Sequence, residues 1–204
     1  QRDFAESIRK SADNLMIVIN DILDFSKIEA GRMVLETVPF NLYLVLEEIM
    51  EIMSYKAFEK GLEPTFLIKP EVPCLVKGDP GRLRQILINL LSNAIKFTRQ
   101  GTVVLRTELE KEENQSVILR FSVQDTGIGI PENKMEKLFQ AFSQVDTSHT
   151  REFGGSGLGL TIARSLVQAI ADVEVAAALA LDEPAVGIEH HLDRGERVAA
   201  GARV

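Results

Sequence analysis

Two glycine-rich stretches, at 125–131 and 154–160, constrain this chain more than any other feature. The first reads Asp-Thr-Gly-Ile-Gly-Ile-Pro and the second reads Gly-Gly-Ser-Gly-Leu-Gly-Leu. Glycine lets the backbone lie close to a ligand, and the free N–H groups at the start of a helix bind phosphate. Because helical periodicity follows the second stretch, the two together predict a nucleotide pocket. Two other interpretations remain open at this point: a turn between elements, and a flexible linker that caps a helix.

The run between the two stretches, 143–153, is polar and poor in core residues. This composition is typical of a mobile lid over a ligand. Arg151 could reach a phosphate from this run, and His149 is interpreted as a solvated loop residue. Phe139 and Phe142, just before it, are expected in the core or at the hinge of the lid.

A helix is predicted over 80–98, because Asp79 can cap it and a proline occupies its first position. Asn89, Asn93 and Lys96 follow at i, i+4 and i+7, so they share one face. Two amides and an ammonium beside an apolar stripe need partners. An amide oxygen suits a Mg²⁺ ion that bridges phosphates, and Lys96 would neutralise phosphate charge. Structural amides or a solvated polar face would give the same pattern.

Residues 1–30 are predicted to form one long helix that ends at Gly31. Its apolar seam alternates between four- and three-residue spacing, which is typical of a helical bundle or coiled coil. The seam consists of Phe4, Ile8, Ser11, Leu15, Val18, Ile22 and Phe25. Such a helix needs a partner to be stable in water. The partner is expected to be another helix of a dimerisation domain, and packing into the core of the same domain is the alternative.

Between and after these features, further elements follow from apolar periodicity, caps and turn residues. Strands are predicted at 33–40, 63–69, 74–77, 102–108 and 117–124, and helices at 41–60 and 157–170. A charged turn at 110–115 would join the last two strands into an antiparallel hairpin. Helices against mostly antiparallel strands indicate an α+β fold, a two-layer α/β sandwich preceded by the long helix.

Composition excludes several function classes. A formal net charge of -7 argues against a nucleic-acid partner. The single cysteine, Cys74, excludes an internal disulfide and is consistent with a cytoplasmic setting. No apolar run is long enough to span a bilayer. No glycine is followed by lysine, so a P-loop is absent, and the glycine runs do not match a dinucleotide fingerprint. Because the chain starts without methionine and in mid-pattern, it is expected to be part of a longer protein whose membrane anchoring the sequence leaves open.

Taken together, the motifs resemble those of sensor histidine kinases. The segment 89–98, Asn-Leu-Leu-Ser-Asn-Ala-Ile-Lys-Phe-Thr, resembles their N box, and the segment 125–129 resembles their G1 box. Phe139-Gln-Ala-Phe142 resembles the F box, and 155–160 resembles the G2 box. The segment 20–31 resembles the end of the second dimerisation helix in hybrid-type members. The resemblance covers residues 1 to about 170 and implies the Bergerat (GHKL) ATP-binding fold, which type II topoisomerases and the Hsp90-type and MutL-type ATPases share.

This resemblance implies a protein-histidine kinase of a two-component system, which transfers the γ-phosphoryl group of Mg·ATP to a histidine. By the family pattern, Asn93 would bind Mg²⁺, Lys96 and Arg151 would face phosphates, and Asp125 would recognise adenine. The implied nucleotide-binding positions are Asn89, Asn93, Lys96, Phe97, Asp125, Gly127, Gly129, Ile130, Gly155, Gly157, Leu158, Gly159 and Leu160. The implied partners are a second copy, bound through helix 1–30, and the receiver domain of a response regulator.

Asn89 distinguishes between branches of this superfamily. In the ATPase branches a glutamate stands four residues before the metal-binding asparagine and activates water, whereas an amide cannot act as a base. Asn89 therefore favours a kinase and counts among the expected catalytic positions, with Lys96 and Arg151. A Bergerat-type ATPase or chaperone-like clamp, and a non-catalytic dimerising adaptor, remain as alternatives.

Two features depart from the family pattern. The three histidines, His149, His190 and His191, do not lie in an acidic helical motif. The phosphoacceptor is therefore expected outside this chain, on the first dimerisation helix. The segment 171–204 is alanine-rich and has no lysine, so it is expected to be an unrelated tail, with a divergent family terminus as the alternative. The predicted division is 1–30 for the second dimerisation helix, 31–170 for the catalytic domain and 171–204 for the tail.

Overall fold

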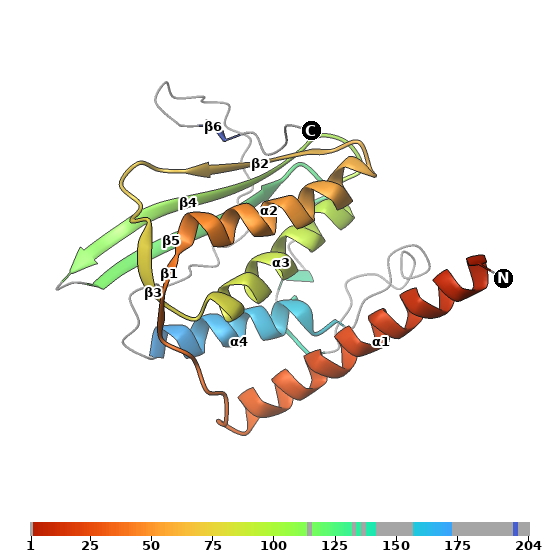
Figure 1. Cartoon of the computed structure of the whole chain (residues 1–204), viewed down its shortest axis with the longest axis horizontal. Coiled ribbons are helices and arrows are strands. Elements are labelled where there is room, and N and C mark those ends of the chain that lie inside the picture. The colour runs from red at the N-terminus through yellow and green to blue at the C-terminus, as the bar shows by residue number, and fades with distance from the viewer. Residues whose placement is uncertain are drawn as a thin grey trace.

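A layer of helices packs against one face of a twisted sheet, and a long helix precedes both layers in the chain (Figure 1). The structure is a computed structural model, and it describes residues 2–113, 116–131, 134–135, 138–141, 157–172 and 198–199. The elements are α1 (Arg2–Glu29), β1 (Val38–Asn41), α2 (Leu42–Phe58), β2 (Glu63–Ile68), β3 (Leu75–Gly78), α3 (Pro80–Phe97), β4 (Thr102–Glu113), β5 (Ser116–Asp125), α4 (Gly159–Asp172) and β6 (Val198–Ala199).

The larger sheet has the strand order β5-β4-β2-β6, and β1 and β3 form a separate two-stranded antiparallel sheet. The pairing of β2 with β4 is parallel, whereas β4 pairs with β5, and β2 with β6, in antiparallel register. The parallel pairing arises because the chain crosses from β2 to β4 through β3 and α3. The expectation of mostly antiparallel strands is confirmed, with this one parallel pair as the exception.

The core lies between the sheet and the helices α2, α3 and α4. Alternate residues of β4, Val103, Leu105 and Thr107, are buried on the helix side, as the two-residue period of a strand requires. α3 contacts α2 on one side and α4 on the other, so it is the central helix of the layer (Figure 1). The predicted α+β sandwich is confirmed, and this central helix carries the polar face that the sequence predicted.

Side-chain caps define the starts of two helices, as the sequence predicts. The Asn41 side chain accepts a hydrogen bond from the Leu44 N–H at 3.2 Å, which starts α2. The Asp79 carboxylate accepts one from the Arg82 N–H at 3.0 Å, which starts α3. A capping oxygen satisfies one of the donors that the first turn leaves unpaired.

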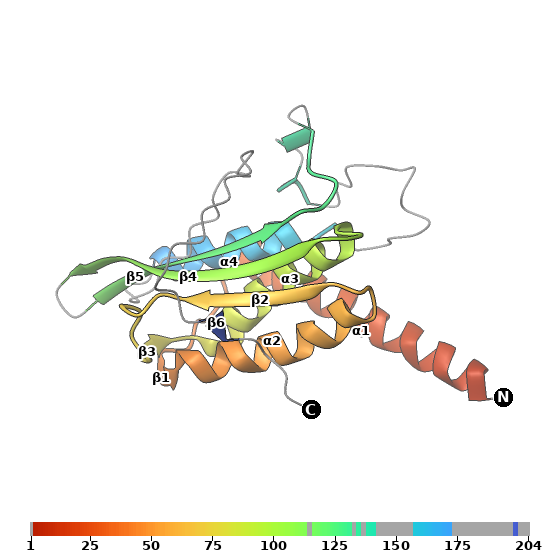
Figure 2. The ribbon, with the colours of Figure 1, turned by 90° about the horizontal axis from the view of Figure 1, so that it is seen from above.

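α1 is one helix of 28 residues, and its N-terminal half projects beyond the strands of the sheet (Figure 2). The C-terminal part of α1 is anchored to the domain through Asp24. The Asp24 carboxylate accepts hydrogen bonds from Arg82 at 3.0 Å and from Gln85 at 2.8 Å. Gly31, with φ of 63°, follows the helix as predicted. Most of the predicted seam is exposed, including Phe4 at 78%. Within the described residues, none of the helices combines the length and the hydropathy that a bilayer crossing requires.

The strand predicted at 33–40 is wrong in extent. Only Val38–Asn41 forms a strand, because its partner, β3, is itself only four residues long. The preceding segment is held differently: the backbone N–H of Glu36 donates to the second oxygen of Asp79 at 3.1 Å. The hairpin of β4 and β5 is confirmed, but its strands continue into the predicted charged turn as far as Glu113.

Candidate functional site

One face of α3 presents the three polar residues that the sequence singled out. Asn89, Asn93 and Lys96 are each half-buried, on a helix whose opposite face fills the core with residues such as Leu87 and Leu91. Helical spacing places the three about one turn apart. The structure therefore brings together two amides and an ammonium along one face of α3.

Asn89 connects this face to the start of α4. Its amide nitrogen donates to the carbonyl oxygen of Gly159 at 3.2 Å. A β-carbon at Gly159 would lie only 3.3 Å from the side-chain oxygen of Asn89. Glycine at 159 thus allows the first turn of α4 to lie against α3. Leu158, just before this turn, is fully buried and fixes it from the core side.

The turn after β5 lies against the other end of α3. The Gly127 N–H donates to the Asp125 carboxylate at 2.8 Å. A β-carbon at Gly127 would lie 2.7 Å from the carbonyl oxygen of Phe97, the last residue of α3. Only glycine allows this approach without movement of the backbone. Phe97 itself is 38% exposed, so part of its ring faces solvent beside the turn.

A second connection, between Thr126 and Thr102, fixes the same turn to the start of β4. The Thr126 hydroxyl accepts from the Thr102 N–H at 3.0 Å and donates to the Thr102 carbonyl at 3.4 Å. Gly101 has φ of 116°, and a β-carbon there would collide with the Thr126 hydroxyl. The turn is therefore positioned by three chain segments, α3, β4 and β5.

Asp125 is exposed, because β5 ends there and the chain leaves the sheet. Ile128 and Ile130, on the same turn, are also exposed, at 67% and 41%. The turn thus offers a carboxylate and apolar side chains to a ligand from the surface.

An open pocket of about 390 Å³ lies beside this turn, lined by Arg99, Gln100, Thr126, Gly127 and Ile128. The pocket lies next to Asp125 along the chain, since Thr126 and Gly127 follow that residue directly. It does not by itself include Asn93 or Lys96, so a nucleotide would have to extend from here along α3.

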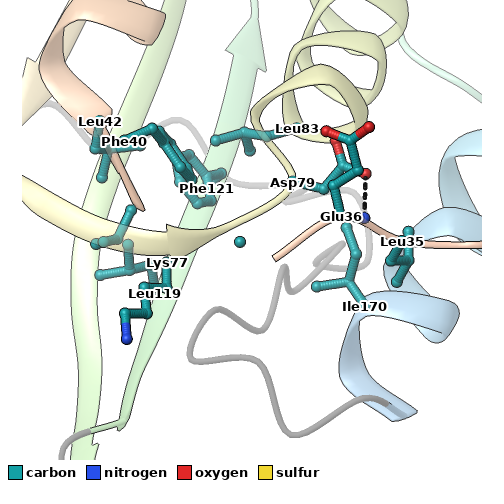
Figure 3. A pocket seen from close by; sticks show the side chains of 12 residues that line it. Leu35, Glu36, Phe40, Leu42, Lys77, Asp79, Leu83, Leu119, Phe121 and Ile170 are labelled. Carbon is teal, nitrogen blue, oxygen red and sulfur yellow. Dashed lines mark hydrogen bonds between the residues drawn. The ribbon is translucent and has the colours of Figure 1, made fainter. Parts of the chain in front are cut away.

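A smaller cavity of about 30 Å³ lies at the opposite end of α3 (Figure 3). Its walls include Leu83, Phe121 and Ile170, with the Asp79 cap at its edge. This volume is enough for one or two water molecules. Because the cavity is mostly apolar and far along the helix from Asn93, we assign it to imperfect core packing and not to the site.

Positive charge collects at the C-terminal end of α3. Burial, and then the nearby charge of Lys60, lower the pKa of the Lys96 ammonium from its usual value of 10.5. The ammonium also lies 5.0 Å from the centre of the Phe97 ring, within the range of a cation–π contact. A bound anion would relieve the repulsion between the two lysines, so the Lys96 ammonium is suited to pair with a phosphate oxygen.

No group of three or more His, Cys, Asp or Glu side chains that could hold a metal occurs among the described residues. A Mg²⁺ ion here would need most of its ligands from a bound phosphate and from water, which is how Mg²⁺ usually binds. The Asn93 amide oxygen fits the single protein ligand that this arrangement requires.

Two predicted site residues, Arg151 and Gly155, lie outside the described residues, and so do His149 and Phe142. Of the second glycine stretch, the structure describes Gly157 onward, and Gly157 has φ of 70°. Leu160 is half-buried in the first turn of α4. Phe139 is half-buried, and its carbonyl accepts a hydrogen bond from the Thr161 hydroxyl at 3.2 Å.

Three residues that shape the site were not predicted from the sequence: Lys60, Gly101 and Thr126. Each acts through a contact with a distant part of the chain. A glycine directly before a strand is a weak signal for Gly101, and a lysine after a helix gives none for Lys60.

Comparison with known proteins finds one matching family and several similar proteins. Residues 78–200 match the family described as histidine kinase-, DNA gyrase B-, and HSP90-like ATPase. The sensor protein GacS of Pseudomonas syringae pv. syringae is 53% identical over 82% of this chain. The signal transduction histidine-protein kinase BarA of Escherichia coli K12 is 48% identical over 82% of it. The chain spans only 18% of the length of each of these relatives.

Two solved structures extend the likeness to three dimensions. Full-length ShkA in complex with AMPPNP is 36% identical, with a TM-score of 0.69 over 84% of this chain and 34% of ShkA. The histidine kinase ThkA in complex with the response regulator protein TrrA is 28% identical, with a TM-score of 0.59 over 82% of this chain and 44% of that one.

Proposed function

Because the chain belongs to the family of histidine kinase-, DNA gyrase B- and HSP90-like ATPases, we propose that it is the ATP-binding part of a hybrid-type sensor histidine kinase. It would bind Mg·ATP and transfer the γ-phosphoryl group to a histidine on a dimerisation helix that this chain does not contain. The similarity to GacS and BarA supports the kinase branch.

One observation carries the proposal: α3 meets both glycine-rich stretches. Asn89 holds the first turn of α4 through Gly159, and the backbone of Phe97 touches Gly127 of the other stretch. The polar face of α3 therefore lies between a turn with a carboxylate and a helix N-terminus. A nucleotide needs these groups in one place: a partner for its base, and N–H groups and cations for its phosphates.

The chain's residues would divide the work along α3. Asp125 would accept a hydrogen bond from the adenine amino group, and Phe97 would pack beside the base, with Gly127, Gly129 and Ile130 forming the wall. Lys96 would pair with oxygens of the phosphates. Catalysis of phosphoryl transfer depends mainly on such positioning and charge neutralisation.

Further binding groups would come from the second glycine stretch and the lid. The first turn of α4, at 157–160, and Gly155 would offer backbone N–H groups to phosphate, and Arg151 would add a charge. Asn93 would hold Mg²⁺, and the ion would supply charge neutralisation for the phosphates.

Asn89 supports a kinase over the alternative of a Bergerat-type ATPase. An amide cannot take a proton from water, so the general base of the ATPase branches has no equivalent at this position. In this structure the Asn89 amide instead holds α4 in place. Slow hydrolysis would preserve ATP for transfer to a protein histidine.

The proposed partners follow from α1 and from the relatives. The exposed apolar side chains of α1 include Phe4, Ile8 and Leu15, and they would pack against the missing dimerisation helix and a second copy. A response-regulator receiver domain would take the phosphoryl group onward, by analogy with the ThkA–TrrA complex. We also propose a cytoplasmic location, where ATP and the receiver domain are available.

The test mixes the 204-residue chain with radiolabelled ATP, Mg²⁺ and a separate dimerisation domain that carries the acceptor histidine. If the chain transfers phosphoryl to the histidine, the added domain should gain an acid-labile, alkali-stable label. The label should be absent when that histidine is replaced by glutamine. Release of labelled phosphate without protein label would favour the ATPase. Failure to bind ATP at all would leave only a non-catalytic adaptor.

A further inference from the structure

Lys60, in the turn that follows α2, reaches across to the end of α3. Its ammonium donates to the carbonyl oxygens of Ile95 at 2.9 Å and Lys96 at 2.8 Å. Lys60 lies 35 and 36 residues from these partners, so the contact joins two separate elements of the helix layer. Lys60 belongs to none of the four motifs.

The two carbonyls are groups that a helix cannot satisfy by itself. The last carbonyls of an α-helix have no N–H four residues further on, and the final bond of α3 is the one from the Thr98 N–H to the Ala94 carbonyl. A cation at this end also interacts favourably with the helix dipole. Lys60 thus supplies a charged cap to the end of α3 from a separate part of the chain.

The turn of α3 that Lys60 caps is the one that carries the site. It contains Lys96 and Phe97 and begins just after Asn93, and the Phe97 carbonyl contacts Gly127. If this turn frayed, the lysine and the ring would lose their positions together with the wall of the pocket. Fraying of end turns is common where the last carbonyls are unpaired.

The backbone around Lys60 holds the ammonium in place. The N–H groups of Lys60 and Gly61 donate to the carbonyls of Ala57 and Phe58, both at 2.9 Å, and Gly61 has φ of 71°. This closed turn ends α2 and sets the direction in which the Lys60 side chain leaves it. The cap therefore connects the end of α2 to the end of α3.

We propose that Lys60 is a positioning residue for nucleotide binding, which holds the last turn of α3 so that Lys96, Phe97 and Gly127 keep their binding geometry. This inference rests on the proposed function. Lys60 acts through hydrogen bonds to the backbone and does not itself touch the nucleotide. Its charge, after burial, also lowers the pKa of Lys96, so its replacement changes a measurable property of a second residue.

The decisive variant is Lys60→Met, which keeps most of the aliphatic stem and removes the charged donor. The Kd of Mg·ATP, measured by calorimetry on the full chain, should rise about fivefold or more, because apparent affinity falls with the fraction of molecules in the binding-competent state. Lys60→Arg, which retains a cationic donor, should restore the Kd to within about threefold. Lys56→Met is the matched control, since it removes a lysine from the last turn of α2, four residues before Lys60, and its Kd should stay within about twofold.

A readout without nucleotide separates positioning from a general loss of stability. The Lys96 ammonium, followed by NMR through titration, should show a higher pKa in Lys60→Met than in the unsubstituted chain, and an unchanged one in Lys56→Met. The melting temperature of each variant shows whether it is folded at the temperature of the binding assay.

The outcomes are distinct. If the unsubstituted chain binds Mg·ATP and folded Lys60→Met binds it equally well, the inference is wrong while the proposed function stands. If Lys60→Met loses affinity but Lys56→Met loses as much, the effect is one of surface charge and the inference is again wrong. If the unsubstituted chain does not bind Mg·ATP, the proposed function itself fails.

Discussion

Replacing Gly127 by alanine tests the close contact between the Asp125 turn and α3. The β-carbon would lie 3.0 Å from the carbonyl carbon of Phe97 and 2.7 Å from its oxygen. Carbon atoms pack at about 3.5–4.0 Å, so the turn or the end of α3 must move by about 0.5 Å or more. Both segments are anchored, the turn through Thr126 and the helix through Lys60, which limits relaxation.

The cost of this variant can be worked from those contacts. Overpacking a well-packed site costs about 1–3 kcal/mol. Disturbing the hydrogen bond from the Gly127 N–H to Asp125 adds about 0.5–1.5 kcal/mol. A total of about 2–4 kcal/mol should lower the melting temperature of a chain of this size by about 5–15 °C. ATP affinity should also fall, because Asp125 and Phe97 move relative to one another.

The assay is thermal unfolding followed by circular dichroism, together with calorimetric titration of ATP below the melting temperature. Gly31→Ala is the control, because Gly31 has φ of 63°, a β-carbon there would meet no atom within 4 Å, and it lies at the end of α1. Its strain of about 1–2 kcal/mol should leave ATP affinity unchanged. If Gly127→Ala melts within about 1 °C of the unsubstituted chain and binds ATP equally well, the packing argument is refuted.

Three further variants test separate contacts. Asn89→Ala removes the bond to Gly159 and should cost about 0.5–1.5 kcal/mol in urea unfolding; an unchanged midpoint would mean that Asn89 does not hold α4. Asp24→Asn should loosen α1 and speed proteolysis at the 30–37 segment, which would stay equally resistant if the bonds to Arg82 and Gln85 did not anchor the helix. Lys96→Met should weaken ATP binding. Without nucleotide, the same variant should unfold with an equal or higher free energy of unfolding. Because the folded pKa of Lys96 lies below 10.5, its ammonium opposes folding below that pKa, so the stability gap between variant and parent should shrink as pH rises toward 10.5; a gap independent of pH would contradict this.

Local signals in the sequence were sufficient to predict most of the helices. Asn41 and Asp79 cap helices where predicted, because a side chain that accepts from the backbone three residues on needs no distant partner. The strand at 33–40 was predicted too long because its length depends on a distant partner. The extent of a strand depends on its partner, and β3 offers only four residues.

The site shows the same division between local and distant causes. Asn89, Asn93 and Lys96 share a face because helical geometry alone requires it. The contact of Phe97 with Gly127 and the cap from Lys60 depend on how elements pack, so no spacing in the sequence reveals them. The exposure of Asp125 likewise follows from where β5 ends at the sheet.

The most direct test of the account is Mg²⁺-dependent binding of ATP to Asn93→Ala. Calorimetric titrations with Mg·ATP and with ATP in excess EDTA should differ clearly for the unsubstituted chain, because the metal would join the phosphates to the Asn93 amide. In Asn93→Ala the two titrations should give the same weak affinity, while the melting temperature stays near that of the parent. If the variant keeps the full Mg²⁺-dependent gain in affinity, α3 does not hold the metal, and the central claim that its polar face is the nucleotide site is contradicted.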